Sequence, residues 1–165
     1  MKKVVHIDFS WQRLMRDVEE QADYVGAKIS PSEYYDKLMV TEADKKHLNT
    51  ILSEAIVEFD ALARDYRHEL KEGEFVITMP MNYDDSSTVQ LSVSIRKYFA
   101  TFLLRQWMRY MGASGKEYDD AEFTEKLEGQ KKNILVLLNR RQFMPLAFFE
   151  SMRTEPGVGM RIEVQ

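Results

Sequence analysis

The amino-acid sequence predicts a mainly α-helical fold, a bundle of about five helices with a small β element. Long stretches of the 165 residues place apolar side chains in steps of three and four, as helices packed along one face do. Three short segments, near residues 4–9, 75–81 and 160–164, instead place large apolar side chains at every second position, which is typical of strands. Hydrophobic residues make up 44% of the chain, so one domain with a sizeable core is expected.

The first two elements are predicted to be a strand and a helix. Lys3–Phe9 alternates apolar and polar residues, and Ser10 is a suitable N-cap for the helix that follows. Gly26 is expected to end that helix, because a glycine commonly terminates one. The apolar stripe of the helix comprises Trp11, Leu14, Met15, Val18, Ala22 and Val25.

Two further helix starts follow. Ser30-Pro31-Ser32-Glu33 combines a cap, a proline at the first helical position and a capping-box glutamate, which predicts a short helix over Tyr34–Met39. Thr41-Glu42-Ala43-Asp44 starts another helix, whose apolar register continues over Glu42–Lys71 without a glycine or proline. A helix of that length spans about 45 Å, whereas a compact domain of this size is about 40 Å across. We therefore expect this helix to kink or the molecule to be elongated.

The next part of the chain holds a strand and an ambiguous segment. Phe75–Met81 alternates and predicts a strand, with Pro80 close to its end. Thr88–Ile95 also alternates, which alone favours a hairpin with that strand. Its apolar residues nevertheless continue in helical steps with no breaking residue, so we favour a buried helix from about Ser87 to Met111.

The last predicted helix is capped by Asp119 or Asp120 and runs to about Arg141. Gly129 weakens it by about 1 kcal/mol relative to alanine. These elements make residues 1–142 a helical domain with a small β element. Residues 143–165 are predicted to form an apolar arm or tail.

Charge and composition exclude several classes of protein. A formal net charge of -4 argues against a general nucleic-acid binder, which usually needs a strong positive field. The absence of cysteine excludes disulfides, zinc–thiolate sites and thiol nucleophiles. The apolar run that follows Lys3 stops at His6, and no other run is long enough to span a membrane, so we expect a soluble protein without a signal peptide.

No catalytic motif is recognisable. Gly112-Ala113-Ser114-Gly115-Lys116-Glu117 resembles a phosphate loop, but it has two residues between its glycines rather than four and no serine or threonine after the lysine. The chain also lacks the Gly-x-Ser-x-Gly pattern of serine hydrolases. We therefore expect no enzymatic activity and no cofactor.

The titratable residues have structural interpretations. His6 and Asp8 share a strand face and supply two potential metal ligands, but we favour an ordinary polar strand face. His68 is interpreted as part of a solvated helix end. The pairs Asp84-Asp85 and Asp119-Asp120 precede predicted helices, so we interpret them as caps rather than as acid–base or magnesium sites.

The segment Arg140–Phe149 has the composition of a protein–protein interface, in which arginines lie beside large apolar side chains. The plainer alternative is a helix C-terminus whose arginines favour the helix dipole. Each large apolar side chain left in water forgoes about 1.5–3 kcal/mol, so the tail must be buried on its own domain or on a neighbour. The candidate interface residues are Arg140, Arg141, Phe143, Phe148, Phe149, Ile162 and Val164.

Five segments, in order and spacing, carry a resemblance over about residues 18–145. They are Tyr24-Val25-Gly26-Ala27-Lys28, Thr41-Glu42-Ala43-Asp44, Val76-Ile77-Thr78-Met79-Pro80-Met81-Asn82, Arg105-Gln106-Trp107-Met108 and Asn139-Arg140-Arg141. Together they resemble a family of prophage structural proteins of Bacteroides-type bacteria. The resemblance implies a neck, head-to-tail connector or tail-adaptor subunit, built as a helical bundle with a β element and assembled as a ring. It also favours a helix over Thr88–Ile95, whereas the tail beyond Pro145 has no counterpart.

We therefore expect a non-enzymatic structural protein of a phage or prophage particle that acts through protein–protein contacts. Its expected partners are other virion proteins and copies of itself, with no membrane and no specific nucleic acid, in the virion or in the bacterial cytoplasm during assembly. The alternatives are a cytosolic helical adaptor or regulatory protein of a bacterial host, and an enzyme with an unfamiliar site.

Overall fold

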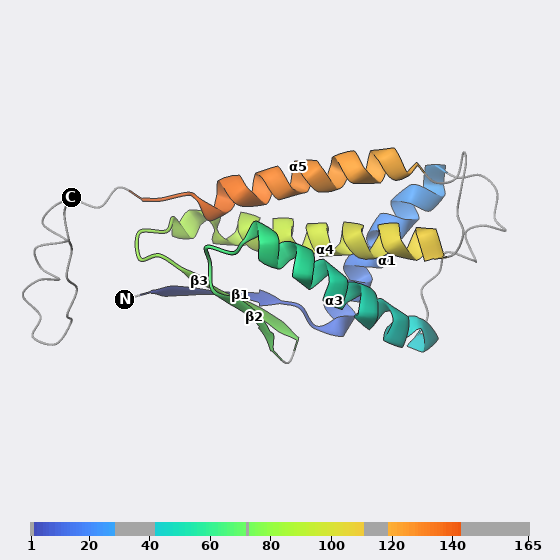
Figure 1. Ribbon diagram of the computed structural model, residues 1–165, viewed down its shortest axis with the longest axis horizontal. Helices are drawn as coiled ribbons and strands as arrows, with labels where there is room; N and C mark the ends of the chain where they lie inside the picture. The colour runs from blue at the N-terminus through green and yellow to red at the C-terminus, as the bar shows by residue number, and fades with distance from the viewer. Residues whose placement is uncertain (1, 29–41, 72, 111–118, 143–165) are drawn as a thin grey trace, which may run out of the picture.

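The computed structural model describes residues 2–28, 42–71, 73–110 and 119–142 (Figure 1). This part of the chain is mainly helical with a small antiparallel sheet, as predicted. It forms four α-helices where the sequence predicts about five, and the helix predicted over Tyr34–Met39 lies outside it. The elements are β1 (Lys3–Asp8), α1 (Trp11–Lys28), the 3-10 turn η1 (Glu42–Asp44), α3 (Lys45–Leu62), β2 (His68–Lys71), β3 (Glu74–Met79), the 3-10 turn η2 (Asp85–Ser87), α4 (Thr88–Tyr110) and α5 (Asp120–Leu138).

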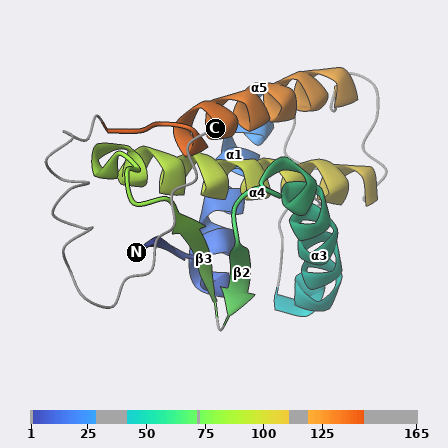
Figure 2. The same ribbon diagram turned by 60° about the vertical axis from the view of Figure 1, so that its left-hand side comes forward.

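The sheet has the strand order β1-β3-β2, and both pairs are antiparallel. Alternate side chains of β1 and β3 are buried, which places one face of the sheet on the helices and leaves the other face exposed. Figures 1 and 2 show the helices on one side of the sheet, with α5 on the far side of α4. The buried residues of the two strands are Val5, Ile7, Phe75, Ile77 and Met79.

Helix α4 is the central element of the fold. Every residue from Tyr98 to Leu104 is buried, as is Trp107, so the helix is covered on more than one side. The prediction of a helix over the ambiguous segment Thr88–Ile95 is confirmed, because α4 begins at Thr88. Within this segment only Leu91 and Ile95 are buried, and Val89 is 72% exposed. Its predicted end at Met111 lies just outside the described residues.

The prediction of one uninterrupted helix over Glu42–Lys71 is wrong. After η1, helix α3 ends at Leu62, and the N–H of Ala63 donates to the carbonyl of Phe59 at 2.9 Å. The chain then turns and forms β2. Pairing with β3 gives β2 main-chain partners across the sheet, and this tertiary gain overrides the helical register of a segment whose apolar residues fit both structures. The expectation of a helix longer than the domain is therefore also wrong.

Gly73 makes the turn between β2 and β3 possible. Its φ of +82° lies in the left-handed region, which favours glycine. A Cβ at this position would also come within 3.2 Å of the Ser10 Cα, so a side chain would crowd the link between β1 and α1. This residue therefore reverses the chain at a point where a helix was predicted to end.

The remaining boundaries differ from the predictions by a few residues. Helix α1 continues to Lys28, two residues beyond Gly26, and α5 ends at Leu138 rather than near Arg141. Strand β3 covers Glu74–Met79 and stops before the proline at position 80, which has no N–H to donate. The arm predicted at 143–165 and its strand near 160–164 lie outside the described residues. Among the described residues, no helix is both long and apolar enough to cross a membrane.

Candidate functional site

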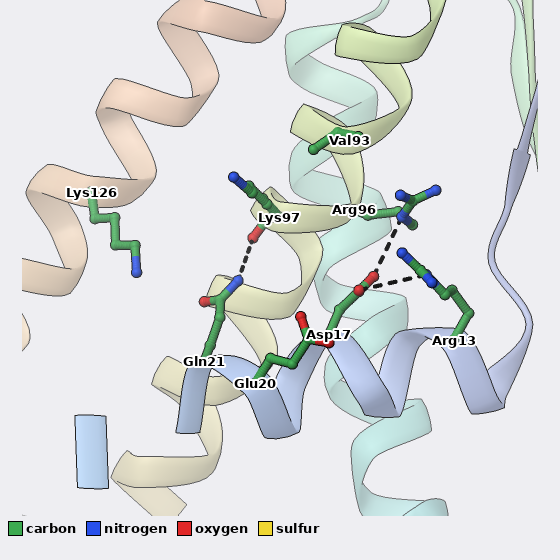
Figure 3. Close-up of a pocket in the computed structure, with 8 residues that line it drawn as sticks. All are labelled: Arg13, Asp17, Glu20, Gln21, Val93, Arg96, Lys97 and Lys126. Atoms are coloured by element: carbon green, nitrogen blue, oxygen red, sulfur yellow. Dashed lines mark hydrogen bonds and ion pairs between the residues drawn. The ribbon is translucent and has the colours of Figure 1, made fainter. Parts of the chain in front are cut away.

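A charged hollow lies between α1, α4 and α5 and is the first candidate site (Figure 3). It has a volume of about 370 Å³. Four residues on successive turns of α1 form one wall, α4 supplies three, and Lys126 of α5 reaches towards it from the other side. The lining residues are Arg13, Asp17, Glu20, Gln21, Val93, Arg96, Lys97 and Lys126.

Asp17 organises one half of this hollow. Arg13 Nε lies 3.6 Å from Asp17 Oδ1, and Arg96 Nε lies 3.4 Å from Asp17 Oδ2. The side chains of Asp17 and Arg96 are 15% and 18% exposed, so this pair is only partly screened by water. One carboxylate thus joins α1 to α4 and holds two guanidinium groups together (Figure 3).

The other half of the hollow is basic. Lys97 and Lys126 form no ion pair with any residue in the described part of the chain, whereas Glu20 pairs with Arg16 at 3.4 Å. Four basic and two acidic side chains line the hollow, although the whole chain carries a net charge of -4. The arrangement can attract an anionic group. None of the described residues that line the hollow is a serine, threonine or histidine.

A buried polar network lies beneath the hollow. Thr101 is fully buried. Its hydroxyl lies 2.8 Å from Gln21 Oε1 and 2.8 Å from the Lys97 carbonyl oxygen, and it can donate its one proton to either acceptor. Gln130 Nε2 donates to the same hydroxyl oxygen at 3.0 Å. Gln130 Oε1 is buried and has no hydrogen-bond partner in the described part of the chain. The three helices therefore meet through amide and hydroxyl groups rather than through apolar packing alone.

The predicted interface residues Arg140 and Arg141 lie at a second place, where the end of α5 meets the turn before η2. Arg141 forms a β-bridge with Tyr83, and the N–H of Gln142 donates to the Asn82 carbonyl at 2.7 Å. Lys3 Nζ donates to the Tyr83 carbonyl at 3.1 Å, which brings β1 to the same place. We call residues 82–84 and 139–142 the junction.

Both arginines of the junction have partners within this chain. Arg141 Nη1 donates to the Leu138 carbonyl at 2.7 Å, and Nη2 donates to the Tyr66 hydroxyl at 2.9 Å. Arg140 Nη1 lies 3.3 Å from Ser87 Oγ. These contacts satisfy the end of α5, as the plainer alternative predicts. The other candidates, Phe143, Phe148, Phe149, Ile162 and Val164, lie outside the described residues.

The junction also contains perturbed titratable groups. The Ser86 hydroxyl donates to Asp84 and is the main reason that the pKa of this carboxyl lies below its usual value; the side chains of Gln142 and Ser87 add to the effect. Burial raises the pKa of the Tyr83 hydroxyl, which has no hydrogen-bond partner in the described part of the chain. Asp84 thus ties the end of α5 to the start of α4.

The other titratable motifs are structural. Asp8 accepts a hydrogen bond from the Ser10 N–H at 2.9 Å, which is the main cause of its lowered pKa, and His6 pairs with Glu74 at 3.0 Å. Within the described ranges, no three side chains of the metal-binding types are grouped as a metal site. The interpretation of His68 as a solvated helix end is wrong, because it lies on β2 with its ring edge-on to Phe59.

The two aspartates of the Asp119-Asp120 pair have different roles from each other. Asp119 caps α5, since its Oδ1 accepts from the Ala121 N–H at 2.9 Å, as predicted. Asp120 is not a cap: it makes a bidentate pair with Arg105 at 2.9 and 3.0 Å and also binds Arg109. The hollow itself was missed at the sequence level. The available signal was Arg96-Lys97, two adjacent basic residues directly before the buried stretch Tyr98–Leu104 of the same helix.

No family model, no curated protein and no solved structure matches this chain.

Proposed function

We propose that this protein is a non-enzymatic structural subunit of a phage or prophage particle, a head-to-tail connector or neck component that assembles into a ring. The observation that carries the proposal is the junction, which holds the chain in place as far as Gln142. The next residues are Phe143-Met144-Pro145-Leu146-Ala147-Phe148-Phe149. An apolar stretch that starts from a fixed anchor is suited to being buried on a neighbouring subunit.

Exposed apolar side chains near the junction support the same proposal. Val89 and Val136 are 72% and 59% exposed. Val89 precedes Gln90, which accepts a hydrogen bond from Arg140, and Val136 lies one helical turn before Arg140. Both valines are therefore at the end of the α4–α5 pair from which the apolar stretch departs. Single exposed valines are ordinary on a protein surface. These two support the proposal because both lie at the same end of the α4–α5 pair.

The experiment is a measurement of assembly state. We expect mass photometry and negative-stain imaging of the full chain to show closed rings of a single size. The double substitution Phe148→Ser and Phe149→Ser should shift the population to monomers, because it removes apolar area from the contact. The matched double substitution to leucine should keep the rings. A wild-type chain that stays monomeric at every concentration would overturn the proposal and favour the host adaptor.

A further inference from the structure

Strand β1 lies at an edge of the sheet, and its hydrogen-bonding register identifies which backbone groups face outwards. In an antiparallel pair, opposed residues alternate between hydrogen-bonded and non-hydrogen-bonded pairs. Phe9 stands opposite Gly73 by continuation of the β1–β3 register, and its N–H donates to the Gly73 carbonyl at 2.7 Å. Residues 3, 5, 7 and 9 therefore direct their N–H and C=O groups towards β3.

The remaining residues of β1 direct their backbone groups away from the sheet. These are Val4, His6 and Asp8, and all three are exposed. The opposite side of β3 agrees with this assignment, because the Thr78 N–H donates to the Arg67 carbonyl at 2.8 Å and so faces β2. We call the outward N–H and C=O groups of Val4, His6 and Asp8 the open edge. Within the described ranges, no strand pairs with it.

An edge of this kind is a template for another strand. We infer that the open edge binds the segment Met160–Val164 of a second copy of this chain, which adds a fourth, antiparallel strand to the sheet. The inference deepens the proposed function and depends on it, because it names the contact that joins neighbouring subunits.

The side-chain pattern of the segment fits the two faces of β1. Met160, Ile162 and Val164 alternate with Arg161 and Glu163. When Ile162 stands opposite Ile7 and Val164 opposite Val5, the apolar residues extend the buried face of the sheet. A shift of the segment by one residue along β1 would put the same apolar side chains on the exposed face of the sheet instead.

Charge selects the antiparallel direction. In the register just described, Arg161 stands opposite Asp8 and Glu163 opposite His6, so each exposed pair has complementary character. A parallel strand would place Glu163 near Asp8 and Arg161 near His6. Like charges opposite each other destabilise a sheet, so the antiparallel pairing is preferred.

The length of the connecting chain allows an exchange between copies. The described structure ends at Gln142, next to the start of β1, and residues 143–159 separate it from the segment. Seventeen extended residues span about 55 Å, more than the roughly 40 Å diameter of the domain. Each subunit would then present one edge and one segment. Such head-to-tail contacts close into a ring when the rotation between subunits allows it.

The test uses two variants that each lack one half of the contact. His6→Pro removes an outward N–H and leaves the bonds between β1 and β3 in place, because edge strands tolerate proline at such positions. His6→Ala is the matched control, since it also loses the pair with Glu74 but keeps the N–H. A chain that ends at Gly159 keeps the open edge and the apolar stretch from Phe143 to Phe149, and lacks only the segment. Circular dichroism and thermal melting verify that each variant is folded.

We expect the wild type and His6→Ala to form rings, and both the His6→Pro variant and the shortened chain to be monomeric. The subunit contact of His6→Pro should weaken about tenfold or more. A mixture of the His6→Pro variant with the shortened chain should give a one-to-one dimer, because one supplies the segment and the other the open edge.

Hydrogen exchange gives an independent readout should His6→Pro fail to fold. The amides of Val4, His6 and Asp8 should be protected in the wild-type ring and exchange rapidly in the shortened chain. Rings that persist in the shortened chain would overturn this inference and leave the proposed function intact. A monomeric wild type with protected amides would mean that the segment pairs within its own chain, which overturns both.

Discussion

The two sides of α4 are packed in different ways. Towards the sheet, Phe99 meets Phe9, Phe59 and Phe75, with ring centroids 4.9, 5.4 and 5.9 Å away. Towards α1 and α5, the same helix presents the Thr101 hydroxyl to the side chains of two glutamines. One side of the helix is therefore an aromatic core and the other is a polar network.

The two sides of α4 therefore contribute differently, the aromatic side to stability and the polar side to the alignment of the helices. Ring packing is strong but tolerates several arrangements of similar volume. A buried hydroxyl between Gln21 and Gln130 accepts only one alignment of three helices, because any shift leaves polar groups without partners. We expect the aromatic side to supply most of the stability and the polar side to fix how α1 and α5 are placed. The charged hollow lies on the polar side, so its shape depends on that network.

The largest effect is expected from Phe75→Ala. Phe75 is fully buried and its ring also contacts Phe59 at 5.4 Å, so its loss leaves a cavity in the aromatic core. The free energy of unfolding should fall by about 3–5 kcal/mol, measured by urea unfolding with circular dichroism. Phe75→Leu is the control and should cost less. A loss below about 1 kcal/mol for alanine would contradict the tight packing described here.

A smaller loss is expected from Thr101→Val, which keeps the volume and removes the hydroxyl. Gln21 and Gln130 would then lack their shared partner, and the free energy of unfolding should fall by about 1–3 kcal/mol. Thr101→Ser keeps the hydroxyl and serves as the control for packing. Amide chemical shifts of α1 and α5 should change more in the valine variant than in the serine variant. Equal shifts in both would show that the hydroxyl does not align these helices.

Removing a hydroxyl is expected to have the opposite effect at Tyr98. Its Oη is buried and makes no hydrogen bond of good geometry in the described part of the chain, and its pKa is raised, first by burial and then by the nearby carboxylates of Glu58 and Glu128. Tyr98→Phe should leave stability unchanged or increase it by up to about 1 kcal/mol. Tyr66→Phe is the contrast, because the Tyr66 hydroxyl donates to the Leu138 carbonyl at 2.9 Å. It should lose about 1 kcal/mol, and a similar loss at Tyr98 would show that its hydroxyl makes a stabilising hydrogen bond to Glu58.

The smallest effect concerns pH and the junction. Hydrogen bonds hold the pKa of Asp84 below the usual 3.8. The stabilisation that the ionised Asp84 carboxylate gives the folded chain is therefore complete above the usual pKa of this group. It is lost as the pH falls through the lowered pKa of the folded chain. The thermal midpoint of the wild type should decline more steeply below about pH 4 than that of Asp84→Asn. Parallel declines would show that Asp84 does not tie α5 to α4.

Parts of this fold follow from local sequence, and others do not. The strand at β1, the helix at α4 and the cap at Asp119 were predictable because alternation, unbroken helical register and cap chemistry are local signals. Strand β2 was not, because its one apolar residue, Leu70, fits the helical stripe as well as a strand. Strand β3 decides that His68–Lys71 forms a strand rather than a helix, because β3 follows directly in sequence and its backbone groups need a hydrogen-bonding partner on that side.

The candidate sites divide in the same way. The sequence by itself determined a cysteine-free, mainly helical domain with an apolar stretch after Arg141, since these properties depend only on which residues are present and in what order. Only the tertiary structure decided that Arg13, Arg96, Lys97 and Lys126 surround one hollow, and that Arg141 and Lys3 meet at Tyr83. The physical reason is that these groups come from separate elements, and their proximity exists only once α4 has been buried between the sheet and α5.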